Sequence, residues 1–107
     1  MDLSIEPFKF YDKGEVVLKI VLEDSRYVLL ENTEEVGEIT WSNAGEDLII
    51  VDHTFVEPQF RGQGWAEKLV AASVDYAREN NKKIIPLCPF AKKEFNEKNE
   101  YLDVWKQ

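Results

Sequence analysis

One short stretch of the chain has the residues and spacing of an anion-binding loop. The sequence Arg61-Gly62-Gln63-Gly64-Trp65-Ala66 places two glycines directly before a helical pattern. Glycine tolerates a positive φ and lets the backbone approach a ligand closely. Backbone N–H groups in such a turn, together with the positive end of a helix dipole, favour a phosphate or pyrophosphate. An ordinary strand-to-helix loop has the same pattern, and the spacing fits neither a P-loop nor the three-glycine fingerprint of a dinucleotide fold.

Cys88 and His53 are the other residues able to do chemistry, and each is the only one of its kind in the sequence. Both lie toward the C-terminal ends of predicted strands that should be neighbours. A thiol beside an imidazole can act as nucleophile and base, whereas a packed histidine and an inert buried cysteine are the plainer alternatives. One cysteine excludes an internal disulfide and fits a reducing compartment. We expect no metal, because one cysteine and one histidine cannot build a thiolate zinc site.

The elements that must position these residues begin as strands. Four segments have strand patterns: Val16–Glu23, Arg26–Glu31, Val36–Ser42 and Asp47–Val56. Turn residues at Asp24-Ser25 and Asn43-Ala44-Gly45 separate some of them. The continuous apolar run Leu48–Val51 is typical of a central strand that is covered on both faces. Pro58 ends this last strand, because proline cannot donate a ladder hydrogen bond.

Beyond residue 57 the pattern changes to alternating helix and strand. Gly64–Asn80 has an apolar stripe at helical spacing, and Lys83–Leu87 is a short strand. A strand, a helix and a strand at this spacing form a βαβ unit with parallel strands. Ala91–Lys98 is predicted to form a second helix, and residues 101–105 a docked C-terminal segment. The expected fold class is therefore α/β, with a mixed sheet, antiparallel N-terminal strands and flanking helices.

Length and charge limit what the chain can do. Its 107 residues, 44% of them hydrophobic and 32% charged, fit a single domain over residues 1–107. The net charge is −8, divided as −9 over residues 1–52 and +1 over residues 53–107. This balance disfavours DNA or RNA binding, allows a small polyanion in the second half and mildly favours a cationic partner. The sequence has no leader-like apolar core at residues 1–10 and no apolar run of the ~20 residues that span a membrane, so we expect a cytoplasmic protein.

The glycine loop resembles the Arg/Gln-x-x-Gly-x-Gly/Ala signature of the Gcn5-related N-acetyltransferases, with Arg61, Gly64 and Ala66 at the signature positions. Further motifs resemble a compact single-domain subgroup of that family: His53-Thr54-Phe55-Val56, Arg61 to Ala66, and Pro86-Leu87-Cys88-Pro89-Phe90. Asn99-Glu100-Tyr101 is similar to the subgroup's Pro-Glu-Tyr, with Asn99 departing from it. The resemblance covers residues 26–105 and leaves residues 1–22 without an assigned role.

The resemblance implies acetyl-CoA as the co-substrate. In this fold the two parallel strands beside the glycine loop splay apart, and the pantetheine arm lies in the gap. Pro86 is consistent with such a gap, because it removes one ladder donor. Backbone groups of Phe55 and Val56 should then bond the pantetheine amides, the N–H groups of Gly62 to Ala66 the pyrophosphate, and Arg61 a phosphate oxygen. The expected cofactor-binding residues are Phe55, Val56, Arg61, Gly62, Gln63, Gly64, Trp65, Ala66 and Phe90.

Acetyl transfer to an amine requires a deprotonated nucleophile, a polarised carbonyl and a proton for the leaving thiolate. The cofactor gap can orient a direct attack, and a backbone N–H near Val56 can stabilise the oxyanion. Cys88 is expected either to form an acetyl-thioester with His53 as its base, or to protonate the CoA thiolate. Asp52 and Glu57 are weaker candidates for a base.

These residues predict an acetyl-CoA-dependent N-acetyltransferase that acts on an amine, by direct attack or through Cys88. The alternative is a non-catalytic CoA or acyl-CoA sensor, since the chain lacks the N-terminal helices that usually help form the acceptor site. A third interpretation is a small α/β interaction domain whose glycine loop is only a turn. The identity of the amine, and the choice between monomer and homodimer, stay open at this stage.

Overall fold

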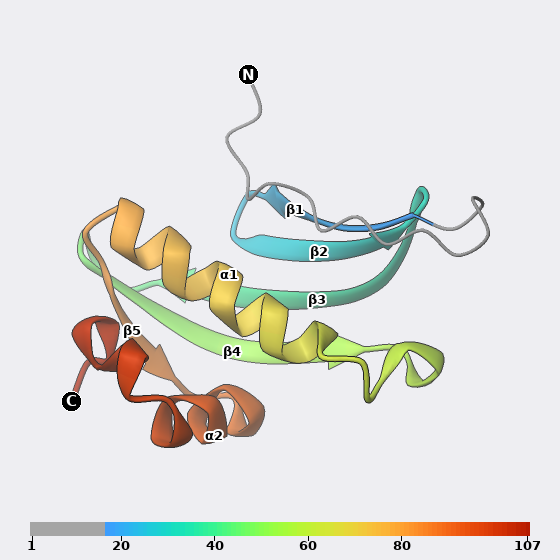
Figure 1. Cartoon of the computed structure of the whole chain (residues 1–107). Coiled ribbons are helices and arrows are strands. Elements are labelled where there is room, and N and C mark those ends of the chain that lie inside the picture. The colour runs from blue at the N-terminus through green and yellow to red at the C-terminus, as the bar shows by residue number, and fades with distance from the viewer. Residues whose placement is uncertain (1–16) are drawn as a thin grey trace.

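A five-stranded mixed sheet, whose strand order follows the chain, carries the other elements (Figure 1). The computed structural model describes residues 17–107. The strands are β1 (Leu18–Glu23), β2 (Arg26–Glu31), β3 (Glu34–Asn43), β4 (Leu48–Val56) and β5 (Lys83–Pro86). Strands β1 to β4 pair antiparallel and β5 pairs parallel to β4, which confirms the predicted mixed α/β sheet. The predicted start of the first strand at Val16 lies outside the described residues.

Helix α1 (Trp65–Glu79) joins β4 to β5 and packs across one face of the sheet, where it contacts β2, β3, β4 and β5 (Figure 1). It begins after Gly64, whose φ is 88°, and is followed by Asn81 with a φ of 57°. A left-handed residue just past a helix is a common way for the helix to end. A short 3₁₀ helix, η1 (Pro58–Phe60), precedes the glycine loop, so Pro58 follows the strand as predicted.

The core lies between α1 and the sheet. Ile39 and Trp41 are buried on the same face of β3, and the apolar stripe of α1 covers them. In β4, Ile49 and Val51 are fully buried, but Ile50 is only half-buried. The prediction that β4 is covered on both faces is therefore wrong. Its continuous apolar run packs against α1 on one side only, and the other side stays accessible.

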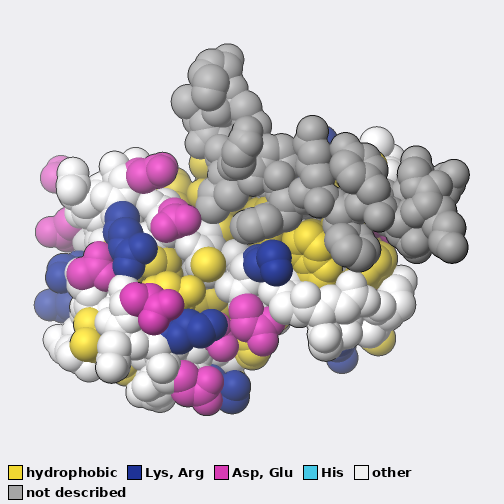
Figure 2. All heavy atoms as spheres, in the orientation of Figure 1, with side chains coloured by type: hydrophobic (Ala, Val, Ile, Leu, Met, Phe, Trp, Pro, Cys, Tyr) yellow, Lys and Arg dark blue, Asp and Glu magenta, His cyan; other side chains and the backbone are white. Residues whose placement is uncertain are grey.

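The C-terminal segment docks beside β5, as predicted. Helix α2 (Pro89–Glu97) is followed by a 3₁₀ helix, η2 (Asn99–Val104), in which Tyr101 and Val104 are buried. The Lys106 N–H donates to the Ile84 carbonyl at 2.9 Å, which ties the chain end to the outer edge of β5. Among residues 17–107, no helix is long and apolar enough to cross a membrane. Figure 2 shows acidic and basic side chains interspersed on the α1 side of the molecule.

Strands β4 and β5 separate after only four paired residues each. Their parallel ladder runs from Leu48 opposite Lys83 to Val51 opposite Pro86. The Val51 carbonyl then accepts hydrogen bonds from the N–H groups of both Leu87 and Cys88, at 2.9 and 3.1 Å. The chain turns into α2 there, while β4 continues along β3 to Val56. We call the space between the two diverging segments the strand gap.

Pro86 does not cause the strand gap, contrary to the sequence-based prediction. The β5-side donors to β4 are the N–H groups of Lys83 and Leu87, to the Asp47 and Val51 carbonyls. Backbone groups alternate between the two edges of a strand, so the missing N–H of Pro86 belongs to the outer edge of β5. The double use of the Val51 carbonyl ends the ladder instead.

Two irregularities set the position of the far end of β4. The pairing between β3 and β4 shifts by one residue between Thr40 and Trp41, so that Asp52 forms a β-bulge. At Gly37 in β3, an added Cβ would lie 2.8 Å from the Phe55 carbonyl oxygen and 3.3 Å from the Leu29 Cβ. Glycine is required there because both neighbours are in the packed sheet.

We predict that Gly37→Ala lowers the free energy of unfolding by about 2 kcal/mol, because the methyl group overpacks the β3–β4 contact. Gly45→Ala is the control: its φ of 95° strains an alanine, but nothing lies within 4 Å of an added Cβ. We expect it to cost about 1 kcal/mol. Urea denaturation followed by circular dichroism measures both. An equal or smaller loss for Gly37→Ala would contradict the close approach of β3 and β4.

Candidate active site

A cavity of about 440 Å³ lies where the strand gap meets the start of α1. Its lining comes from the end of β4, the last residue of η1, the glycine loop, the first turn of α1 and Phe90 of α2. The lining residues are Thr54, Phe55, Val56, Phe60, Arg61, Gly62, Gly64, Trp65, Ala66, Glu67 and Phe90. The structure thus brings together all of the predicted cofactor-binding residues except Gln63. The exposed Gln63 side chain instead donates to the Gln59 carbonyl at 3.4 Å.

The glycine loop has the backbone conformation that anion binding requires. Gly62 and Gly64 have φ values of 78° and 88°, in the left-handed region that favours glycine. Gly64 is the N-cap of α1, and no side chain caps that helix end. Helix N-termini carry N–H groups without intrahelical partners and a partial positive charge, so this end of α1 can accept an anion.

Arg61 is fixed at the edge of the cavity. Its Nε donates to the Val56 carbonyl at 2.6 Å, and its guanidinium lies 5.5 Å from the centroid of the Phe55 ring. A planar guanidinium can stack on an aromatic ring and hydrogen-bond at the same time, which lysine cannot do equally well. The loop therefore combines backbone donors with one oriented cation.

The two predicted pantetheine-binding residues have different orientations. The Phe55 carbonyl faces Gly37 of β3, whereas the Val56 carbonyl faces Arg61 on the other side of β4. Because backbone groups alternate along a strand, Thr54 and Val56 present their main-chain groups to the strand gap. Phe55 contributes its ring, which is 41% exposed, rather than its backbone. This corrects the expectation that the backbone of Phe55 faces the gap.

Cys88 lies at the closed end of the strand gap, against Thr54. The residue is buried, it is the N-cap of α2, and its thiol donates to the Thr54 hydroxyl oxygen with an S–O distance of 3.3 Å. The contact joins the two diverging segments through their side chains. The sequence analysis did not single out Thr54, although its place between His53 and Phe55 in a strand was the signal that it faces the other way.

His53 and Cys88 do not form the predicted pair. The His53 ring is stacked on Phe55, with centroids 6.4 Å apart, and its Nε2 lies 3.6 Å from Oε2 of Glu38. Side chains alternate along a strand, so His53 and Phe55 lie on the face opposite Thr54, to which Cys88 is bonded. The expectation that His53 acts as the base for Cys88 is therefore wrong: β4 separates the two groups.

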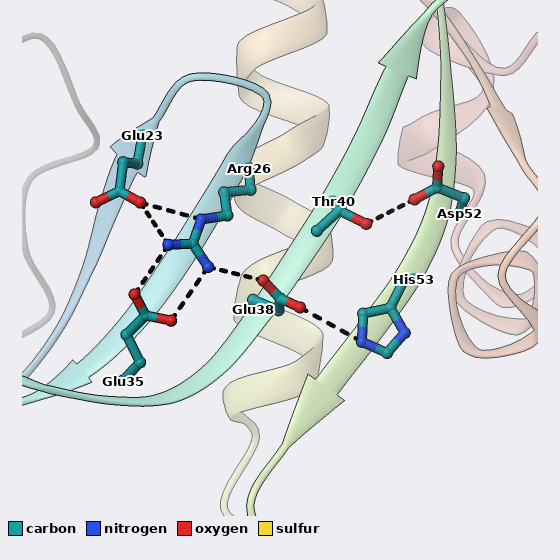
Figure 3. Close-up of polar contacts among 7 residues, drawn as sticks. All are labelled: Glu23, Arg26, Glu35, Glu38, Thr40, Asp52 and His53. Atoms are coloured by element: carbon teal, nitrogen blue, oxygen red, sulfur yellow. Dashed lines mark hydrogen bonds and ion pairs between the residues drawn. The ribbon is translucent and has the colours of Figure 1, made fainter.

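The two weaker candidate bases are engaged elsewhere. The Asp52 carboxylate accepts hydrogen bonds from Thr40 at 2.6 Å and from Ser42 at 3.2 Å. The Glu57 carboxylate accepts one from the Gln59 side chain at 3.1 Å. Figure 3 shows Asp52 beside Thr40, apart from the pair formed by His53 and Glu38.

A group of charged residues lies across β1, β2 and β3 on the sheet face opposite α1, next to His53 of β4 (Figure 3). The Arg26 guanidinium bonds to the carboxylates of Glu23, Glu35 and Glu38. We call these four residues the Arg26 cluster. Its hydrogen bonds hold the pKa of the Glu35 carboxyl below its usual range and raise the pKa of Arg26. The cluster therefore holds Glu38 in place beside His53.

A βαβ unit whose strands separate beside a glycine loop at a helix N-terminus gives this α/β protein a strand gap with the geometry of a site for a phosphate-bearing ligand. Residues 26–104 match the family model described as GCN5-related N-acetyl-transferase. The NMR structure of a GCN5-like protein from Staphylococcus aureus is similar at 36% identity and a TM-score of 0.69, over 83% of this chain and 88% of that one. The chain belongs to the GCN5-related N-acetyltransferase family.

More distant structures share the fold. One is N-acetylglutamate synthase from Neisseria gonorrhoeae, complexed with coenzyme A and N-acetyl-glutamate, with 23% identity and a TM-score of 0.58 over 68% of this chain and 18% of that one. Another is a candidate streptothricin acetyltransferase from Bacillus anthracis, complexed with acetyl coenzyme A, with 18% identity and a TM-score of 0.53 over 82% and 48%. The comparison with curated proteins gives no match.

We predict that Arg26→Gln raises the pKa of Glu35, because the hydrogen bonds from Arg26 lower that pKa. A lowered folded-state pKa means that this interaction stabilises the fold above the ordinary glutamate pKa, and that the effect is lost as pH falls through the lowered value. Carboxyl ¹³C NMR titration measures it. Arg78→Gln is the control, since Arg78 lowers the pKa of Asp103 in the same way. This variant should raise the pKa of Asp103 and leave the pKa of Glu35 unchanged. A Glu35 titration that is insensitive to Arg26→Gln would contradict the cluster.

Proposed function

We propose that the protein transfers the acetyl group of acetyl-CoA to an amine. The observation that carries this proposal is the single cavity that contains both the strand gap and the glycine loop. A gap between diverging strands accepts an extended arm, and the loop accepts the anionic group at its end. The fold is shared with the Neisseria gonorrhoeae and Bacillus anthracis structures, which are complexed with coenzyme A and acetyl coenzyme A. Family membership makes acetyl transfer the expected reaction.

The residues present suit such a co-substrate. The backbone of Thr54 and Val56 offers strand-type hydrogen bonds to the amides of an extended pantetheine arm. The Gly62 to Ala66 loop and the start of α1 would hold the pyrophosphate, with Arg61 available to a phosphate oxygen. Apolar contacts come from Phe55 and Phe90, which line the cavity. The surroundings are mostly apolar with few polar groups, as in small-molecule sites generally.

For the chemical step we propose direct attack by the amine, with Cys88 as the proton donor to the departing thiolate. The Cys88 S–H donates to a hydroxyl oxygen, and a hydroxyl is not a base that removes the proton. Cys88 thus has a proton to give, and the rotatable Thr54 hydroxyl can turn to donate to the thiolate that remains. The thioester-intermediate route requires a base at Cys88, and His53 lies on the other face of β4.

We predict that the purified protein binds acetyl-CoA and CoA, and that Gly64→Ala weakens this binding about tenfold. An alanine at a φ of 88° costs roughly 1–2 kcal/mol, and the loop would relax away from the binding conformation. Gly45→Ala, the same change at a positive φ in the β3–β4 turn, should leave the affinity unchanged. Calorimetric titration measures both variants. If the native protein bound neither ligand, the proposed function would be lost and the loop would be an ordinary turn.

We predict that Cys88→Ala slows acetyl transfer about 10²-fold without changing acetyl-CoA affinity, because it removes the proton donor. Thr54→Val, which keeps the shape but not the hydroxyl, should slow it less, since the thiol remains. The assay is CoA release with a primary-amine acceptor, combined with intact mass spectrometry. An acetyl adduct that appears in the native protein and not in Cys88→Ala would instead support the thioester route. Binding without any transfer would favour the CoA-sensor interpretation.

A further inference from the structure

A chain of polar contacts crosses three strands on the sheet face opposite α1 and ends at His53 (Figure 3). Arg26 Nη1 in β2 donates to Glu38 Oε1 in β3 at 2.8 Å. The other oxygen of the same carboxylate, Oε2, lies 3.6 Å from His53 Nε2 in β4. Glu38 therefore accepts a hydrogen bond from Arg26 through Oε1 and faces the His53 imidazole with Oε2.

Arg26 is itself held from several sides. Its guanidinium also bonds to Glu35 at 2.9 Å and to Glu23, its cross-strand neighbour in β1. A planar guanidinium with several donors in use has little freedom to turn. The position of the Glu38 carboxylate is thus set by the Arg26 cluster and not by a single flexible ion pair.

The imidazole lies next to the cavity. Its ring is stacked on Phe55 with an interplanar angle of 7°, and Phe55 lines the cavity at the strand gap. Nε2 of the ring faces Glu38, which leaves Nδ1 as the ring nitrogen that can accept a proton. The His53 side chain is 53% exposed, so a second substrate can reach it from the sheet face opposite α1.

We propose that His53 accepts the proton of the acceptor amine, and that Glu38, held by Arg26, is the positioning residue that orients its ring. This inference rests on the proposed acetyl transfer. It also assigns the approach of the amine to the sheet face opposite α1, because Cys88 and Thr54 occupy the other side of β4. The acidic groups of the Arg26 cluster on that face favour an acceptor that arrives as an ammonium ion.

The proton balance of the step is complete. The amine nitrogen attacks the thioester carbonyl carbon, so that an N–C bond forms and the C–S bond breaks with its electron pair on sulfur. Because the acceptor arrives as an ammonium ion, two protons leave its nitrogen: the first passes to His53 before the attack, and the second is released to water after it. The CoA sulfur takes the proton of the Cys88 thiol. The imidazolium then returns one proton to the Cys88 thiolate through water. Within residues 17–107, the charged groups around His53 on this face include Glu38, the other members of the Arg26 cluster, Asp52, Glu57 and Arg61. Asp52 is engaged by Thr40 and Ser42, and Glu57 by Gln59.

The first test uses the fact that His53 is the only histidine in the sequence, so its ring signals in NMR are unambiguous. Glu38→Gln keeps a hydrogen-bonding side chain for Arg26 but removes the charge beside Nε2. The ¹⁵N chemical shift of His53 Nε2 should change, because the charged carboxylate that lies 3.6 Å from it becomes a neutral amide. Glu35→Gln is the matched control: it also removes an Arg26 partner, but the structure pairs His53 with Glu38, so the Nε2 chemical shift should not change.

The second test is transfer from acetyl-CoA to two probes: Nα-acetyl-lysine amide, a basic amine, and an arylamine that is already unprotonated at neutral pH. His53→Ala and Glu38→Gln should slow transfer to the basic amine about tenfold or more and should barely affect the arylamine, because only the basic amine must lose a proton before it can attack.

An unchanged His53 Nε2 chemical shift in Glu38→Gln, or an equal loss of transfer for both amines, overturns this inference alone. Transfer to neither amine by the native protein with acetyl-CoA bound overturns the proposed acetyl transfer together with it. Calorimetry on the same variants establishes separately whether acetyl-CoA binds. A protein that fails to bind acetyl-CoA overturns the proposed function, whereas one that binds it normally and shows no role for Glu38 overturns only the positioning role.

Discussion

The carbonyl of Val51 is the group on which the site depends. It accepts hydrogen bonds from two successive N–H groups, those of Leu87 and Cys88, and so ends the parallel ladder between β4 and β5. The chain leaves into α2 at that point, while β4 continues as the neighbour of β3 alone. A ladder that continued would fill the space between the strands with backbone hydrogen bonds and leave no slot for an extended ligand.

The strand gap forms a ligand-sized cavity because α1 begins beside it. The buried stripe of α1 packs against the sheet, and the Tyr76 ring lies 4.8 Å from Trp41, which fixes the helix over β3. The glycine loop then delivers the helix N-terminus to the cavity without a side-chain cap. Arg61, immediately before the loop, turns back to the Val56 carbonyl. Packing of Tyr76 against Trp41 thus helps to fix where the N-terminus of α1, with its partial positive charge, lies.

The bulge at Asp52 determines which face of the sheet each later side chain of β4 points to. Side chains alternate along a strand, and one inserted residue reverses that alternation for everything beyond it. Thr54 consequently faces Cys88, while His53 and Phe55 face the polar side with Glu38. Without the bulge these assignments would exchange. The proposed proton donor, Cys88, and the proposed proton acceptor, His53, therefore lie on opposite sides of β4 because of one irregularity in that strand.

Local sequence patterns were sufficient to predict most strands, turns and helices of this protein. The alternation in β1 to β3, the turn residues, the stripe of α1 and the glycine loop depend on neighbours a few residues apart, so the sequence by itself determined them. The partners of His53 and Cys88 depend on strand register and on a bulge, which involve residues 15 and 34 positions away. Periodicity carries no information about such a shift, since the residues around Asp52 read as an ordinary strand. Only the tertiary structure decided that Cys88 meets Thr54 and that His53 meets Glu38, because side-chain facing is set by the pairing of β4 with β3 and β5.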